Sequence, residues 1–281
     1  MPRATNRTNE TNGTYEIEYE TFGSADDPAL ICISGLGSQL LSYPVELCGA
    51  FVDRGFYVIR MDNRDAGLSS MSSDDDSYTL NDMADDAVAV LDAAEVTDAV
   101  VLGVSMGGMI AQVTAIRHPE RTRALVSIMS TTGEPDVGNP TLDAWDVLTA
   151  PPEDSIEAQI EADVKASRIW SNPEWFDPDT LRANLAAGYQ RAWNPGAAQR
   201  QINAIMRSGD RVAGLSALTV PALVVHGGSD TLIDPSGGAR TAELIGDAEY
   251  LLIEEMSHDF VPQAWPAVVE AVTALAARTF S

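Results

Sequence analysis

Ser105 lies between Gly103 and Gly107 in the stretch AVVLGVSMGGMIAQ, where an apolar run ends and a helical pattern begins. A serine at a sharp turn between a strand and a helix presents its hydroxyl at the carboxyl edge of the sheet, where open α/β sheets bind ligands. Such a turn is crowded and needs small neighbours, which the two glycines supply. The first turn of the helix also offers unpaired backbone N–H groups to a negative charge. The stretch therefore predicts a nucleophilic serine.

A serine hydroxyl is a weak nucleophile, so the chain must also supply a base for its proton and an acid that orients the base. The chain contains three histidines. His118, at the end of the helix after the serine, is interpreted as a structural or surface residue. His226 falls inside the strand-like run ALVVHGG and is interpreted as packed there. His258 follows the strand-like run YLLIEE at the same edge of the sheet, which makes it the predicted base.

The acid is expected in the loop after ALVVHGG, which contains Asp230 and Asp234. Asp230 is closer to the end of the strand and is the predicted acid, whereas Asp234 precedes Pro235 and is predicted to cap the next helix. Backbone N–H groups are the expected donors to an oxyanion. The glycine turn in CISGLGSQ directs the N–H of Leu36 toward the serine, and the N–H of Met106 directly follows it. These two N–H groups are the predicted oxyanion hole.

Strand-like and helix-like segments alternate along the chain and would position these groups. A half-buried strand is indicated where Tyr15, Ile17 and Tyr19 alternate with glutamates, and short apolar runs indicate strands covered on both faces. This order predicts an α/β fold with a mainly parallel, doubly wound sheet and right-handed crossovers. The expected strands are residues 14–22, 29–34, 57–62, 98–104, 124–130, 222–228 and 249–255.

Residues 133–216 break this alternation, because prolines divide the segment into helix-like pieces and no clear strand occurs in it. The segment is predicted to be a helical cap insertion between two parts of one core, residues 14–132 and 217–281. Residues 1–13 are predicted to be a polar N-terminal tail. The aromatic rings of the insertion either pack it on itself and on the core, or some of them line a substrate pocket. The candidate pocket residues are Trp170, Trp175, Tyr189 and Trp193.

Charge and composition exclude some partners. The chain has 42 acidic and 17 basic residues and a formal net charge of −25, which repels nucleic-acid phosphates and anionic lipids. Neither nucleic acid nor a membrane is expected as a partner. The acidic surface is interpreted either as an adaptation to high salt or as ordinary solvation. The first residues lack the pattern of a secretory signal, so a cytoplasmic location is expected.

The two cysteines, Cys32 and Cys48, lie in apolar runs and are expected to be buried thiols. No cysteine spacing typical of metal ligands occurs. His226 and Asp230 have the residue types of metal ligands, but no third ligand accompanies them in the sequence. No metal and no other cofactor is expected.

The chain resembles members of the α/β-hydrolase superfamily. Its order Ser105, Asp230, His258 is the family's order of nucleophile, acid and base. The run VIRMDNRDAGLS is similar to the family's Asp-x-Arg-Gly-x-Gly-x-Ser loop, and AIRHPERTRALVSI to the segment after the nucleophile helix. The resemblance covers most of residues 14–132 and 217–281. Within the superfamily, the chain is similar to aclacinomycin methylesterase-like enzymes and small bacterial carboxylesterases.

The chain departs from the family pattern at three positions. Ser34 precedes Gly35 where the family usually has His-Gly, Asp65 stands where glycine is usual, and Ser257 replaces the glycine often found before the histidine. None of these departures removes a catalytic group, but the first and the third bear on the shape of the pocket.

The predicted function is that of a serine hydrolase, which cleaves esters of small hydrophobic molecules through an acyl-enzyme. Ser105 attacks the carbonyl carbon, His258 takes and returns the proton, and Asp230 holds the imidazole. Two other enzyme activities fit the same residues, a cofactor-free haloperoxidase (perhydrolase) and a carbon–carbon bond hydrolase. A hydrolase-like receptor for a small molecule, with slow or no turnover, is the alternative from another class.

Overall fold

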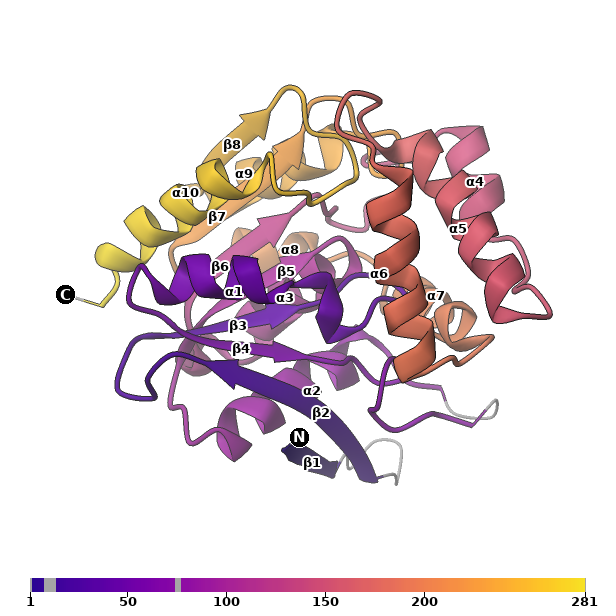
Figure 1. Cartoon of the computed structure of the whole chain (residues 1–281). Coiled ribbons are helices and arrows are strands. Elements are labelled where there is room, and N and C mark those ends of the chain that lie inside the picture. The colour runs from indigo at the N-terminus through magenta and orange to yellow at the C-terminus, as the bar shows by residue number, and fades with distance from the viewer. Residues whose placement is uncertain (1, 8–13, 74–76, 281) are drawn as a thin grey trace.

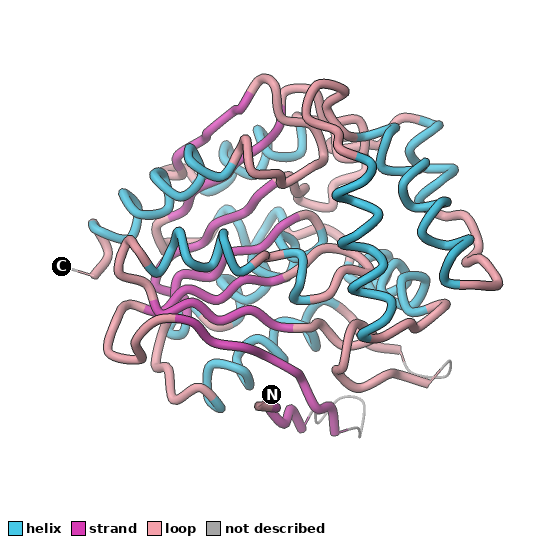
Figure 2. The backbone as a smooth tube through the Cα atoms, viewed as in Figure 1, coloured by secondary structure: helices cyan, strands magenta, loops and turns pink. Residues whose placement is uncertain are grey.

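The computed structural model describes residues 2–7, 14–73 and 77–280, in which a twisted sheet lies between two layers of helices (Figures 1 and 2). The strands are β1 (Arg3–Arg7), β2 (Thr14–Phe22), β3 (Ala29–Ile33), β4 (Tyr57–Met61), β5 (Ala99–Val104), β6 (Thr122–Ile128), β7 (Ala222–Gly227) and β8 (Glu249–Ile253). Their order in the sheet is β1-β2-β4-β3-β5-β6-β7-β8. β2 pairs antiparallel with β1 and β4, and all other neighbours pair parallel. The prediction of a mainly parallel α/β sheet is confirmed.

The central strands β3 and β5 are apolar throughout because both of their faces are buried. The helices α1 (Val45–Val52) and α10 (Trp265–Ala277) cover one face, and α2 (Leu80–Ala93), α3 (Met106–Arg117), α8 (Val212–Ser216) and α9 (Ser236–Ile245) cover the other (Figure 1). In β3, Leu30 and Cys32 face the layer of α1 and α10, whereas Ile31 and Ile33 face α2 and α3. This burial on two faces fixes the register of the sheet and therefore the edge at which its loops gather.

Residues 133–216 contain helices and no strand. The first four of these helices are α4 (Leu142–Leu148), α5 (Ile156–Trp170), α6 (Pro178–Arg191) and α7 (Ala197–Ser208). Side chains at the residues before α4, α5 and α6 accept hydrogen bonds from the first turns, which explains where these helices begin. In Figure 1 the four helices lie beyond the edge toward which the parallel strands point. The boundaries of the cap insertion stay predictions.

The prediction of a polar tail over residues 1–13 is wrong for β1, which forms the edge of the sheet beside β2. Its inward-facing residues, Ala4 and Asn6, are buried. The Asn6 amide donates to a carboxylate oxygen of Asp86 at 2.7 Å. The strand was hidden in the sequence because its two inward positions hold a small and a polar residue, so no apolar alternation is visible. Residues 8–13 lie outside the described residues.

Cys32 and Cys48 are both free and buried, as predicted. Burial raises the pKa of the Cys48 thiol to about 11, so it stays protonated and a poor nucleophile. No helix in the described part of the chain is long and apolar enough to cross a bilayer. The same described residues contain no group of three His, Cys, Asp or Glu side chains arranged to hold a metal ion.

Candidate active site

Ser105 occupies the sharp turn between β5 and α3. Its φ of 58° and ψ of −121° are unusual for a residue with a side chain. Hydrogen bonds hold this strained conformation, because the Ser105 N–H donates to the Ile128 carbonyl at 2.9 Å and the Ser105 carbonyl accepts from Gly108 N–H at 2.9 Å. A Cβ atom on Gly103 would lie 1.9 Å from the Gly107 carbonyl oxygen. Gly103 must therefore be a glycine.

His258 connects the serine to an acid through two hydrogen bonds. Its Nε2 lies 3.0 Å from Ser105 Oγ, and its Nδ1 lies 2.7 Å from Asp230 Oδ2. An ionised carboxylate only accepts, so Nδ1 carries the proton and Nε2 offers its lone pair to the serine hydroxyl. The three side chains follow β5, β7 and β8, which end at the same edge of the sheet (Figure 1). The structure thus brings together the three residues that the sequence singled out.

Asp230 is buried and ionised. Its Oδ1 accepts hydrogen bonds from the backbone N–H groups of Leu232 at 2.9 Å and Ile233 at 2.8 Å. Burial by itself raises the pKa of Asp230, but the nearby charge of His258 and hydrogen bonds from His226 and His258 outweigh it and lower the pKa to about 2. The loop therefore presents a fixed negative charge to His258 Nδ1 at neutral pH.

His226 also contacts this acid, a contact that the sequence did not reveal. The ring is fully buried in β7, as predicted. Its Nε2 lies 2.9 Å from the Ile233 carbonyl oxygen and 3.4 Å from Asp230 Oδ2, so Nε2 carries the proton. A Cβ atom on Gly238 would lie 2.3 Å from Nδ1, which shows how closely α9 approaches the ring. The sequence signal for this contact was the position of His226, four residues before Asp230.

The two predicted oxyanion donors lie beside the serine. Met106 is the first residue of α3. The turn that contains Leu36 passes directly over Ser105, because a Cβ atom on Gly35 would lie 3.4 Å from Ser105 Cβ. Among the described residues, neither the Leu36 N–H nor the Met106 N–H donates to a protein acceptor. Two free donors beside a nucleophile are the arrangement that stabilises a developing oxyanion.

A sequence model of the alpha/beta hydrolase fold matches residues 28–263. The chain belongs to this family. It is 30% identical over 271 residues to rhodomycin D methylesterase of Streptomyces peucetius, covering 88% of this chain and 90% of the relative. It is 27% identical to 3-oxoadipate enol-lactonase 2 of Acinetobacter baylyi, covering 91% and 92% of the two chains. The crystal structure of an enol-lactonase from Burkholderia xenovorans has the same fold, with a TM-score of 0.76 and 20% identity over 97% and 99% of the chains.

This α/β hydrolase therefore has ester-hydrolysing relatives.

Two residues that the sequence predicted to lie outside the catalytic site, Asp234 and His118, bond to other partners. Asp234 Oδ1 accepts from the Ser236 N–H at 2.9 Å, at the start of α9. His118 Nε2 lies 2.7 Å from Asp85 Oδ1 at the end of α3, where both side chains are partly exposed. These contacts agree with the capping role predicted for Asp234 and the structural role predicted for His118.

The departures from the α/β-hydrolase pattern are accommodated by local structure. Asp65 has a φ of 65°, in the left-handed region that explains why glycine is usual there. Its Oδ1 accepts from the Ser72 N–H at 2.7 Å, which helps to hold this conformation. Ser34 is buried, and its hydroxyl donates to the Gln39 carbonyl at 3.2 Å. Ser257, which precedes His258 in the chain, is buried, and its N–H donates to Asp259 Oδ1 at 3.1 Å.

The four candidate pocket residues have different surroundings in this hydrolase. The Trp170 carbonyl accepts a hydrogen bond from the backbone N–H of His258 at 2.8 Å, so the end of α5 is tied to the loop of the base. Trp175 packs against the core cluster of α1 and α10. The Tyr189 hydroxyl bonds to a carboxylate of α5, and Trp193 is half-buried. Their contact with a substrate stays a prediction.

Proposed function

We propose that the chain is a serine hydrolase that cleaves carboxylic esters through an acyl-enzyme. The observation that carries the proposal is the hydrogen-bonded series Ser105, His258 and Asp230, in which Ser105 occupies the sharp turn between β5 and α3 in a strained conformation. The similarity to a methylesterase and an enol-lactonase supports an ester bond as the target. The cytoplasmic location expected from the sequence stays a prediction.

The geometry supports a two-step mechanism. Ser105 Oγ attacks the ester carbonyl while His258 Nε2 takes its proton, and the imidazolium then gives that proton to the leaving alkoxide. Asp230 holds the Nδ1 proton and stabilises the imidazolium. The N–H groups of Leu36 and Met106 stabilise the oxyanion of each tetrahedral intermediate. A water molecule, activated by the same base, then releases the acid and restores the serine.

The proposed cap is the insertion of residues 133–216, whose helices α4–α7 lie beyond the edge of the sheet (Figure 1), and the substrate is proposed to be a small hydrophobic ester. A cover of this kind limits water at the reaction centre and gives an apolar group a dry wall. Its attachment to the loop of the base through Trp170 supports a place over the site. Alanine variants of Trp170, Trp175, Tyr189 and Trp193 test this, because a pocket residue changes the ratio of kcat/KM for long and short acyl esters.

Steady-state hydrolysis of a panel of p-nitrophenyl and alkyl esters tests the proposal. We expect Ser105→Ala to lower kcat by at least about 1,000-fold with little change in substrate affinity. Ser130→Ala is the matched control, because Ser130 is buried and its hydroxyl has no partner among the described residues. Ordinary turnover in Ser105→Ala contradicts the mechanism. Faster formation of a peracid from hydrogen peroxide and a carboxylic acid, or faster cleavage of a diketone, than hydrolysis of any ester replaces the proposed reaction with one of the two alternatives.

A further inference from the structure

The oxyanion donor Leu36 lies in a tight turn, residues 35–38, that the core alone does not fully hold. The Ser38 N–H donates to the Gly35 carbonyl at 3.2 Å, which closes the turn. Gly37 has a φ of 65°, as the third residue of a type II turn requires. The Leu36 carbonyl accepts from the Ser38 hydroxyl at 3.5 Å, within the turn itself. The Gly37 N–H, by contrast, finds its partner on a helix of the proposed cap.

Gln201 of α7 is one of these partners. Its Oε1 accepts from the Gly37 N–H at 2.8 Å, and its Nε2 donates to the Arg64 carbonyl at 2.8 Å. The orientation of the amide is unambiguous, because a backbone N–H only donates and a backbone carbonyl only accepts. The side chain is fully buried. A Cβ atom on Gly37 would lie 3.5 Å from Ala198 Cβ, so α7 packs directly against the turn.

A second glutamine, Gln39, also joins the core to the helices of the proposed cap, but its side chain comes from the core. Gln39 follows the turn in the core, and its Nε2 donates to the carbonyls of Gly188 at 2.7 Å and Ala192 at 2.9 Å, at the end of α6. Its Oε1 accepts from Arg191 Nη1 at 2.8 Å. The segment that contains Leu36 is therefore held by α7 at Gly37 and by α6 at Gln39.

We infer that Gln201 is a positioning residue of the oxyanion hole, through which α7 sets the distance between the Leu36 N–H and Ser105. The inference rests on the proposed function. Oxyanion donors act only when they are fixed where charge develops, and a displacement of about 1 Å costs up to about 100-fold in rate. Without the amide, the Gly37 N–H and the Arg64 carbonyl lose the partner that joins them, and the turn is free to move away from the serine.

Gln201→Met tests the inference, since methionine keeps the length of the side chain and removes both hydrogen bonds. With p-nitrophenyl acetate as the probe, we expect kcat to fall by about 10- to 100-fold while KM stays within about twofold. The affinity of a trifluoromethyl ketone, which forms a tetrahedral oxyanion on the serine, is expected to fall by the same factor as kcat/KM. Gln199→Met is the matched control, because Gln199 lies on the exposed side of α7.

Gln201→Asn keeps the amide but is one methylene group too short, and it decides the question if the methionine variant does not fold. Wild-type kcat in a folded Gln201 variant overturns the inference, and so does an equal loss of kcat in Gln199→Met. A lower Tm with unchanged kcat also overturns it, because it leaves Gln201 a packing role only. Labelling of the wild type with a fluorophosphonate distinguishes a failure of this inference from a failure of the proposed function. Labelled Ser105 with an unaffected Gln201 variant refutes only the inference, and an unlabelled Ser105 refutes the proposed function.

Discussion

Ser105 and Asp230 are held by hydrogen bonds within the core, whereas the turn that contains Leu36 is held by α6 and α7 of the proposed cap. Asp230 takes two hydrogen bonds from Leu232 and Ile233, residues within three positions of it. Gly37, by contrast, is bonded to Gln201 across 164 positions of the chain, and Gln39 to Gly188 across 149. A shift of α6 and α7 is therefore expected to leave Ser105 and Asp230 in place and to move the Leu36 N–H, the proposed oxyanion donor. The proposed cap is expected to affect the rate of the reaction through the Leu36 N–H, without displacing Ser105.

The largest expected effect lies on the locally held side of this comparison. Asp230→Asn removes the charge that orients His258 and stabilises its imidazolium, so we expect kcat to fall by about 1,000- to 10,000-fold. Asp234→Asn, in the same loop, changes only a side chain that accepts from Ser236 at the start of α9, and is expected to keep wild-type kcat within a few-fold. Steady-state kinetics of both variants check this ranking. The reverse order would identify Asp234 as the acid.

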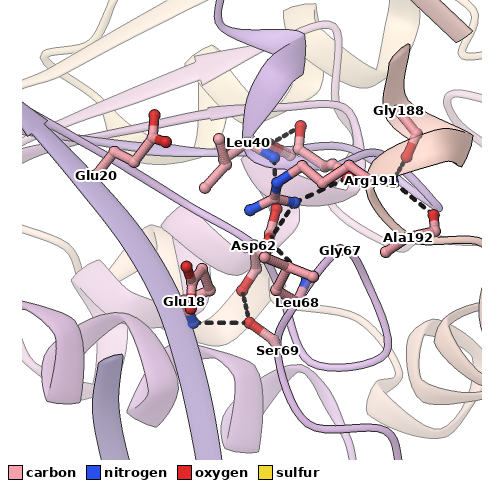
Figure 3. A network of polar contacts seen from close by, with 12 residues as sticks. Glu18, Glu20, Leu40, Asp62, Gly67, Leu68, Ser69, Gly188, Arg191 and Ala192 are labelled. Atoms are coloured by element: carbon pink, nitrogen blue, oxygen red, sulfur yellow. Dashed lines mark hydrogen bonds and ion pairs between the residues drawn. The ribbon is translucent and has the colours of Figure 1, made fainter. Parts of the chain in front are cut away.

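The side held by α6 and α7 includes an ion pair whose carboxylate is buried. Arg191, at the end of α6, reaches the Asp62 carboxylate of the core at 2.7 Å (Figure 3). Asp62 also accepts from the N–H groups of Leu40 at 2.7 Å and Leu68 at 2.9 Å. Burial raises the pKa of Asp62, which these three donors offset in part. The Asp62 carboxylate thus links Leu40, which follows the turn of Leu36, to α6 of the proposed cap.

Arg191→Met is expected to lower the free energy of unfolding by about 3 kcal/mol, because it leaves the Asp62 carboxylate buried without its cation. Arg182→Met is the control on the same helix, since Arg182 pairs with the exposed Glu161 and such pairs contribute little. Urea unfolding of both variants measures the difference. Equal stability of the two variants would show that the cap is not fastened at Asp62.

A smaller effect on the free energy of unfolding is expected at acidic pH, where Asp230 becomes protonated. The folded pKa of Asp230, about 2, lies below its ordinary value of 3.8. This carboxylate therefore stabilises the fold above pH 4, and the contribution is lost as the pH falls toward 2. The gap in unfolding free energy between the wild type and Asp230→Asn is expected to change by about 2 kcal/mol between pH 5 and pH 2. A gap independent of pH would mean that the surroundings of Asp230 do not favour its charge.

The smallest expected effect concerns the whole surface. A formal charge of −25 destabilises the compact state by self-repulsion. Sodium chloride at molar concentration screens charges beyond a few ångströms, so we expect it to raise the Tm by several degrees if the acidic surface is an adaptation to salt. Thermal unfolding with and without salt measures the shift. An unchanged Tm favours ordinary solvation.

Features that depend on local sequence were predictable, and those that depend on distant partners were not. Apolar runs and the turn around Ser105 predicted the parallel sheet and the loops that carry His258 and Asp230, because strand ends of a parallel sheet share an edge. β1 was missed because Asn6 finds its partner on α2. Gln201 was missed because its partners are backbone atoms more than a hundred positions away, for which no sequence pattern exists.

Mass spectrometry of the protein after reaction with a fluorophosphonate tests the central claim most directly, because the reagent leaves a stable adduct on an activated serine. The account predicts one adduct per chain, located on Ser105, at a rate that falls sharply in Asp230→Asn. Ser105→Ala is expected to carry no adduct. A wild-type protein that hydrolyses esters without an adduct on Ser105, or an adduct that persists in Ser105→Ala, would contradict the assignment of the nucleophile.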